Sequence, residues 1–373
     1  MIRMNRVAAA VIASCLGSGM LVAPAQAAEK VLMVVSSEGR DQGKSRPGFE
    51  FDEYSQAYWI FRDNGLEVEV ASPAGGAVEP DAYNPEVAYN ARTRADAEAM
   101  RLLANTLDTE DAAPADYAAV FVVGGKGAML DLPGDAALQS LMASIYERGG
   151  VVSAVCHGPA ALVNVRLSDG SALVAGKSIT GFSNEEEALF GKRWVKEFAF
   201  LLEDGMRQKK ARWSEAPLMM PHWVADGRVI TGQNPYSTTG TAEAVVRALG
   251  RAPVARTPYQ DERTMSLVQQ FLDDSIDAAS ALRESREQYQ VELIGMLGYY
   301  QWKAATNPDA VRAALSVMTL AEPYMDAPQL KLAMAEANQS LGQVDEARRL
   351  LQVLLDADPA MAEAKRLMQQ IDG

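Results

Sequence analysis

The sequence predicts an α/β fold in which a doubly wound, mostly parallel sheet is followed by an all-helical C-terminal module. Between residues 30 and 249, short runs rich in β-branched residues alternate with stretches of helical periodicity. This alternation is typical of βαβ units and a parallel sheet. After Pro258 the composition shifts to Ala, Leu, Glu, Gln and Met, without another strand-like run. With 373 residues the chain is long enough for two or three domains.

The first of these domains is expected to cover residues 28–252. Its predicted strands are residues 31–35, 66–71, 118–123, 151–155, 178–180 and 228–231, and its predicted helices include 51–64, 138–148 and 238–249. Residues 74–114 are rich in Pro, Asn, Asp and Ala, a composition typical of a long connection, with one helix expected near its end.

The second predicted part, residues 253–373, is helical. Within it, residues 328–359 resemble a tetratricopeptide repeat, although Ala335 and Asn338 depart from that pattern and only one copy is present. One repeat cannot bury its own apolar face, so the helices around 293–302 and 311–321 are expected to pack against it. Two roles stay open for this region: a cap that stabilises the domain or its dimer, and a binding surface for a protein partner.

The first 27 residues have the features of a secretory signal peptide. A basic start is followed by a short apolar stretch and by Ala25-Gln26-Ala27, which is a typical cleavage site. The stretch is too short and too interrupted for a membrane anchor. Lipid attachment at Cys15 is a second alternative, ranked lower because the apolar run continues beyond it. We therefore expect a periplasmic or secreted protein, in which Cys156 is the only cysteine.

Charge and histidine content exclude several function classes. The formal net charge is −14 at pH 7, which argues against nucleic acid as a partner. The chain has two histidines, His157 and His222, so a histidine-rich metal site is not expected. The sequence predicts neither a metal site nor a cofactor.

Cys156 has the surroundings of a catalytic nucleophile. It follows a predicted strand, with small residues two positions before and after it, as in a nucleophile elbow with Cys in place of Ser. A helix expected to begin near Pro159 would direct its positive end at the sulfur and favour the thiolate. The structural alternative is a small buried cysteine at a tight turn.

A glycine-rich loop, Gly124-Gly125-Lys126-Gly127, follows another predicted strand. Its backbone N–H groups, together with that of His157, are expected to form an oxyanion hole. A phosphate-binding loop is a poor alternative, since the spacing differs and no Ser or Thr follows the lysine.

These motifs, in this order, resemble the ThiJ/PfpI superfamily, which has the class I glutamine amidotransferase-like, flavodoxin-like fold. The matching segments are residues 31–36, 48–53, 70–76, 116–127, 153–160, 179–186 and 231–235. The sequence looks closest to the branch that contains stress-inducible holding chaperones and glutathione-independent glyoxalases. The C-terminal helical region is outside this resemblance.

The resemblance implies roles for several residues. It places the carboxyl of Glu53 against the sulfur, where a partly buried acid keeps its proton, and it makes His157 a general base or proton carrier. Relatives commonly have His at the position of Lys126. As groups that orient His157 we consider Glu185 and Glu186, although acids that open a helix are also ordinary dipole partners. His222 is expected to be structural or near the pocket rim.

The leading functional hypothesis is a cofactor-independent glyoxalase-type reaction on a small carbonyl compound, in a stress-protection role; removal of glycated adducts would use the same groups. The alternatives are a periplasmic holding chaperone or scaffold without catalysis, and a cysteine peptidase or amidase. Glutaminase activity is excluded, because it normally needs a downstream His-x-Glu pair and His222 is followed by Trp223 and Val224. The resemblance also implies a homodimer.

Overall fold

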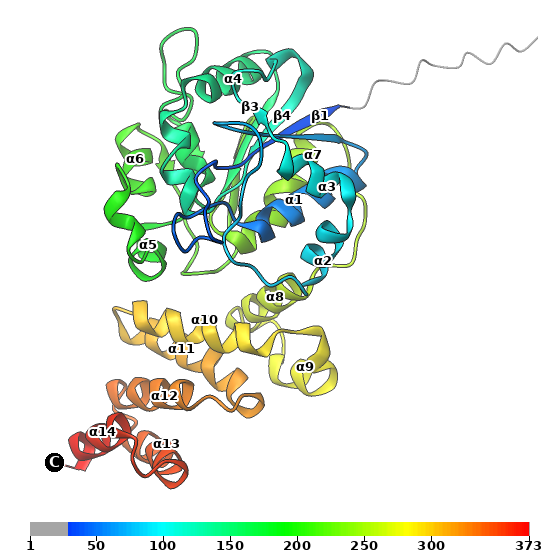
Figure 1. Cartoon of the computed structure of the whole chain (residues 1–373). Helices are drawn as coiled ribbons and strands as arrows, with labels where there is room; N and C mark the ends of the chain where they lie inside the picture. The colour runs from blue at the N-terminus through cyan, green and yellow to red at the C-terminus, as the bar shows by residue number, and fades with distance from the viewer. Residues whose placement is uncertain (1–28, 373) are drawn as a thin grey trace, which may run out of the picture.

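The computed structural model describes residues 29–372, which form an α/β domain followed by a helical module (Figure 1). The predicted signal peptide and Cys15 lie outside the described residues. Within the described part of the chain, no helix is long and apolar enough to cross a membrane.

A seven-stranded sheet forms the centre of the α/β domain. Its strand order is β3-β2-β1-β4-β5-β9-β8. The bounds are β1 Lys30–Val34, β2 Glu67–Ser72, β3 Leu107–Asp108, β4 Tyr117–Val122, β5 Val151–Val155, β8 Trp223–Asp226 and β9 Val229–Gly232. All neighbours pair in parallel except β8 and β9, so the predicted doubly wound, mostly parallel sheet is confirmed.

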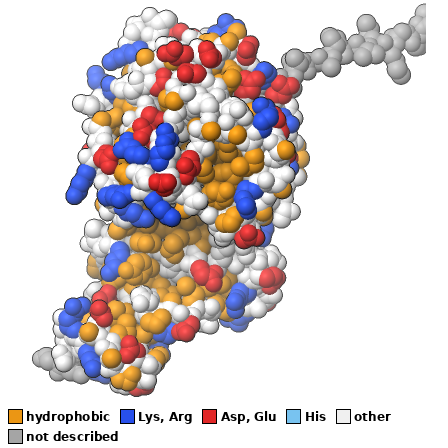
Figure 2. Space-filling view, viewed as in Figure 1, with side chains coloured by type: hydrophobic (Ala, Val, Ile, Leu, Met, Phe, Trp, Pro, Cys, Tyr) orange, Lys and Arg blue, Asp and Glu red, His pale blue; other side chains and the backbone are white. Residues whose placement is uncertain are grey.

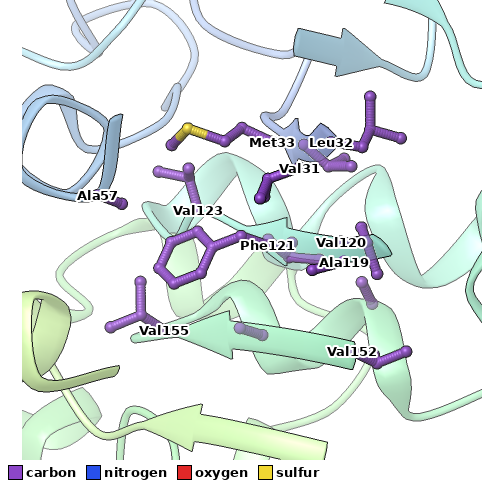
Figure 3. Close-up of a cluster of buried hydrophobic side chains, with 14 of the residues drawn as sticks. Val31, Leu32, Met33, Ala57, Ala119, Val120, Phe121, Val123, Val152 and Val155 are labelled. Carbon is purple, nitrogen blue, oxygen red and sulfur yellow. The ribbon is translucent and has the colours of Figure 1, made fainter. Parts of the chain in front are cut away.

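The sheet is covered on both faces, which explains why its central strands read as continuous apolar runs. Helices α1 (Phe51–Asp63) and α7 (Thr238–Ala248) pack together on one face, and α4 (Ala136–Glu147) lies on the other (Figure 1). Phe61 of α1 meets Phe121 of β4 edge to face, with ring centroids 5.4 Å apart. Figure 3 shows Phe121 among buried side chains from β1, β4 and β5.

The structure differs from the predicted domain at the connection 74–114 and refines it at the strand 178–180. The connection at 74–114 contains two helices, α2 (Ala88–Ala95) and α3 (Ala97–Ala104), and the short strand β3. The predicted strand at 178–180 is β6 (Ser178–Ile179), which pairs with β7 (Arg212–Trp213) in a separate sheet. Side chains of the main sheet bind its backbone instead: Ser178 N–H donates to Asp226 and Thr180 N–H to Thr231.

The C-terminal module is helical throughout its described elements, as predicted. They are α8 Gln260–Leu272, α9 Ala278–Ser285, α10 Val291–Ala304, α11 Pro308–Ala321, α12 Pro328–Ser340, α13 Val344–Ala357 and α14 Ala362–Asp372. Helices α10 and α11 pack as a pair, and so do α12 and α13 (Figure 1). The relation to tetratricopeptide repeats stays a prediction.

The module packs directly against the α/β domain. Leu218, Met219 and Met220 come from the domain, yet they are buried in the apolar core of the module. The side chain of Gln301 on α10 donates to the carbonyl of Leu218 at 3.1 Å. Figure 2 shows hydrophobic side chains gathered on the viewed face where the two parts meet. This contact brings α10 beside the candidate active site.

Candidate active site

Cys156 occupies a strained turn directly after β5. Its φ is +59°, a left-handed conformation that is costly for a residue with a side chain. Two backbone hydrogen bonds hold the turn: Cys156 N–H donates to Gly232 O at 2.9 Å, and Phe182 N–H donates to Cys156 O at 2.8 Å. At Gly158 a Cβ would lie 2.4 Å from Val122 O, so the close approach requires glycine. The structure therefore has the elbow geometry expected around Cys156.

The chain after the elbow differs from the prediction. The helix expected near Pro159 is a five-residue 3₁₀ turn, Gly158–Leu162, which has too few aligned peptides for a strong dipole. Burial raises the pKa of the Cys156 thiol well above its ordinary value, and the negative charge of Glu53 raises it further. The prediction that a helix N-terminus stabilises a thiolate is therefore wrong for this site. The thiol needs a base to remove its proton.

Glu53 lies beside Cys156, where the resemblance placed it. It belongs to α1, is fully buried, and its Oε2 accepts a hydrogen bond from Gly124 N–H at 2.6 Å. A Cβ on Gly124 would lie 2.7 Å from Cys156 Cβ and 2.8 Å from Glu53 Oε2, so the two side chains converge on this glycine. Burial, then the charge of Glu50, raises the pKa of Glu53 well above its usual range. The buried pair of carboxyl and thiol consequently keeps at least one proton at neutral pH.

His157 bridges the sulfur and a second carboxylate. Its Nδ1 lies 3.4 Å from Cys156 Sγ, and its Nε2 lies 2.8 Å from Glu187 Oε2. Burial lowers the pKa of His157, while the hydrogen bond to Glu187 raises it in part, so the neutral imidazole is favoured. With its proton on Nε2, the ring donates to Glu187 and leaves Nδ1 free to accept the thiol proton.

Glu187 is the group that orients His157, so the assignment to Glu185 or Glu186 was wrong. All three belong to α5 (Asn184–Phe190), where successive side chains point in different directions. Glu186 closes a capping box with Ser183 and accepts hydrogen bonds from Met219 N–H and the Asn234 side chain. In the sequence, the run of three glutamates indicated that one of them could reach His157. Which one does so depends on the direction in which each side chain leaves the helix.

Two N–H groups of the glycine-rich loop have other partners and are not available for the expected oxyanion hole, while those of Gly125, Lys126 and His157 keep that role as a prediction. Gly124 N–H is bound to Glu53, and Gly127 N–H donates to Gly48 O at 3.0 Å. Gly125 N–H interacts with the sulfur of Cys156 and favours its anionic form. Gly125 also has a φ of +99°, and a Cβ there would lie 2.6 Å from Gly48 O. The loop thus opposes the rise in the pKa of the thiol, and Lys126 lines the pocket.

A pocket of about 210 Å³ opens above Cys156 and His157. Its other lining residues are Glu50, Lys126, Phe182, Glu186, Phe190, Met219, Asn234, Pro235, Tyr236 and Met296. His222 is outside this lining and shares a hydrogen bond of 2.8 Å with Ser214 Oγ. Among residues 29–372 no cluster of three or more His, Cys, Asp or Glu could hold a metal ion.

Residues 45–248 match the DJ-1/PfpI family. The chain belongs to this family. Glyoxalase 3 of Candida albicans is 33% identical over 232 residues, which cover 59% of this chain and 98% of that protein. A Schizosaccharomyces pombe protein named glutathione-independent glyoxalase hsp3101 is 32% identical, over 58% of this chain and 95% of that protein.

Two solved structures resemble this DJ-1/PfpI chain at similar identity. Rapid Encystment Protein 24 KDa of Francisella tularensis superposes with a TM-score of 0.56 at 32% identity, covering 59% of this chain and 99% of that one. Glyoxalase III of Candida albicans gives a TM-score of 0.55 at 30% identity, and the match covers 59% of this chain and 97% of that one. The family match ends at residue 248, so the helical module of this DJ-1/PfpI protein is outside it.

The first prediction concerns the hydrogen bond between Glu187 and His157. Glu187→Gln is expected to lower the pKa of His157 further, because the carboxylate is what opposes the effect of burial. The chain has two histidines, so an NMR titration of the imidazole protons follows both at once, with His222→Gln to assign the signals. The midpoint of His222 should not move. An unchanged His157 midpoint would contradict this arrangement.

The second prediction concerns the cost of burying Glu53. Its pKa is higher in the folded chain than its ordinary value of 4.5, so the carboxyl stabilises the fold below that pH and loses this effect as the pH rises. Glu53→Gln mimics the protonated acid at every pH. Its gain in unfolding free energy over the wild type should therefore grow from pH 4.5 to 8, by at most about 1.4 kcal/mol per pH unit.

Denaturant titrations at several pH values measure this difference. The exposed Glu110→Gln is the matched control for the loss of one carboxylate. A difference for Glu53→Gln that does not change with pH would show that Glu53 is ionised in the folded protein.

Proposed function

We propose that this chain is a glutathione-independent glyoxalase, which converts a small 2-oxoaldehyde such as methylglyoxal, with water, into a 2-hydroxy acid. The observation that carries the proposal is the buried set of Cys156, His157 and Glu187, with Glu53 beside the sulfur, in a small pocket. The names of the relatives support it, since Glyoxalase 3 of Candida albicans aligns over nearly its whole length.

The first step is addition of the sulfur to the aldehyde. His157 Nδ1 accepts the thiol proton as Cys156 Sγ forms a bond to the aldehyde carbon. The π bond of the aldehyde breaks, and the imidazolium gives the proton to the former carbonyl oxygen, so that the product is a hemithioacetal. Glu187 balances the charge that forms on the imidazole, as a carboxylate does for the histidine of a catalytic triad. The neutral histidine and protonated thiol of the resting site are restored when the cycle ends.

The second step moves a proton between the two adjacent carbons. The proton on the former aldehyde carbon moves to the neighbouring carbonyl carbon, and the hydroxyl proton of the hemithioacetal moves to the oxygen of that second carbon. The first carbon is thereby oxidised to a thioester and the second reduced to an alcohol, so no external oxidant is needed. His157 and Glu53 are the two groups beside the sulfur that can carry this proton. Water then cleaves the resulting thioester, which releases the hydroxy acid and the free thiol.

The third prediction tests this activity. The purified protein should form lactate from methylglyoxal without glutathione, whereas Cys156→Ala and Cys156→Ser should give no more than buffer alone. His157→Ala should reduce kcat/KM by about 10²–10⁴, the usual contribution of a general base. His222→Gln, outside the pocket, is the matched control and should retain activity. Wild-type activity equal to that of Cys156→Ser would refute the proposal.

We also propose that residues 1–27 direct export and are then removed. The support is the pattern of a basic start, an apolar stretch and Ala25-Gln26-Ala27. As a fourth prediction, the protein recovered from a bacterial periplasmic fraction should begin at Ala28, as measured by intact mass. Retention of the first 27 residues, or a lipid on Cys15, would contradict it.

A further inference from the structure

The helical module contributes a side chain to the pocket that holds Cys156. Met296 of α10 lines this pocket, although it lies far beyond the DJ-1/PfpI domain in the sequence. It is 39% exposed, which is high for a large apolar side chain on a packed helix. Tyr300 lies one turn further along α10, on the same face.

A series of ring contacts connects this face of α10 to the catalytic histidine. Tyr300 meets Phe190 edge to face, with centroids 4.8 Å apart. The ring centroids of Phe190 and Phe182 are 6.5 Å apart, and those of Phe182 and His157 are 4.2 Å apart. Two aromatic rings of the pocket lining, Phe182 and Phe190, therefore connect the imidazole to α10 through Tyr300.

The module also holds a second residue of the pocket lining, Met219, in place. Gln301 of α10 binds the carbonyl of Leu218, and the next residue, Met219, lines the pocket with a φ of +63°. Met219 is buried in the core of the module, while its N–H is bound to Glu186. Helix α10 thus fixes the position of Met219 as well as supplying Met296.

We propose that helix α10 is the size filter of the active site and that Met296 determines which carbonyl compounds reach Cys156. This inference rests on the proposed glyoxalase function and deepens it. The favoured substrates are free 2-oxoaldehydes with a compact, apolar substituent, because the outer wall is apolar and the space is about 210 Å³. Bulkier carbonyl compounds are expected to reach the sulfur less readily, because Met296 of α10 occupies part of the pocket lining.

The fifth prediction compares two substrates in variants of the full chain. Met296→Ala enlarges the pocket and should raise the ratio of kcat/KM for phenylglyoxal to that for methylglyoxal by about tenfold, the scale at which apolar pockets discriminate. Met296→Trp should lower this ratio. Met100→Ala, at a methionine of similar exposure on α3, is the matched control and should leave it unchanged.

A second measurement does not need turnover. Mass spectrometry of the Cys156 peptide gives its alkylation rates with iodoacetamide and with the bulkier iodoacetanilide. Met296→Ala should raise the rate with iodoacetanilide relative to iodoacetamide, and Met296→Trp should lower it.

The outcomes separate the two proposals. If the wild type forms lactate but neither Met296 variant changes the substrate ratio or the alkylation ratio by more than about twofold, the size filter is refuted and the glyoxalase proposal stands. If the wild type forms no lactate while the alkylation ratios change as expected, the glyoxalase proposal fails and the filter at α10 is retained.

Discussion

The active site depends on the two backbone hydrogen bonds that hold Cys156 in a left-handed conformation. One joins it to Gly232 at the end of β9, and the other joins it to Phe182 in the segment before α5. Both partners are far from Cys156 in the sequence, so the strain is maintained by the assembled sheet and not by the turn itself. The same arrangement brings Glu53 from α1 and Glu187 from α5 to the carboxyl edge of the strands, where ligands of open α/β sheets bind.

Burial governs the proton chemistry of the site. Removal from water disfavours every charged form, so the pKa of the thiol and of Glu53 rises and the pKa of His157 falls. A resting thiolate–imidazolium pair is therefore unfavourable, and the site holds its protons until a substrate is present. Glu187 opposes this effect for His157 alone. Glu187 thus favours the charged form of His157, whereas the Glu53 carboxyl keeps a proton next to the sulfur.

The order of strands and helices could be predicted because buried parallel strands have an unmistakable composition, as at β1, β4 and β5. The positions of Cys156 and Glu53 followed from the elbow and from the family resemblance. Local pattern could not show that the turn after Cys156 is 3₁₀, that Gly124 N–H is used by Glu53, or that Glu187 faces the histidine. Each of these depends on helix phase or on contacts between distant segments. The role of α10 was hidden for the same reason, since nothing near Met296 in the sequence resembles a catalytic motif.

The contact between Leu218–Met220 and the helical module has a consequence for how the protein is made. The α/β domain is complete in sequence at Ala248, so it is available to fold before α10 has been synthesised. Until then, the three apolar residues that belong to the core of the module have no cover, and the lining of the catalytic pocket lacks Met296. A chain that folds in this order has its cysteine in place first, and the pocket lining and the cover over Leu218–Met220 are completed when the C-terminal helices dock.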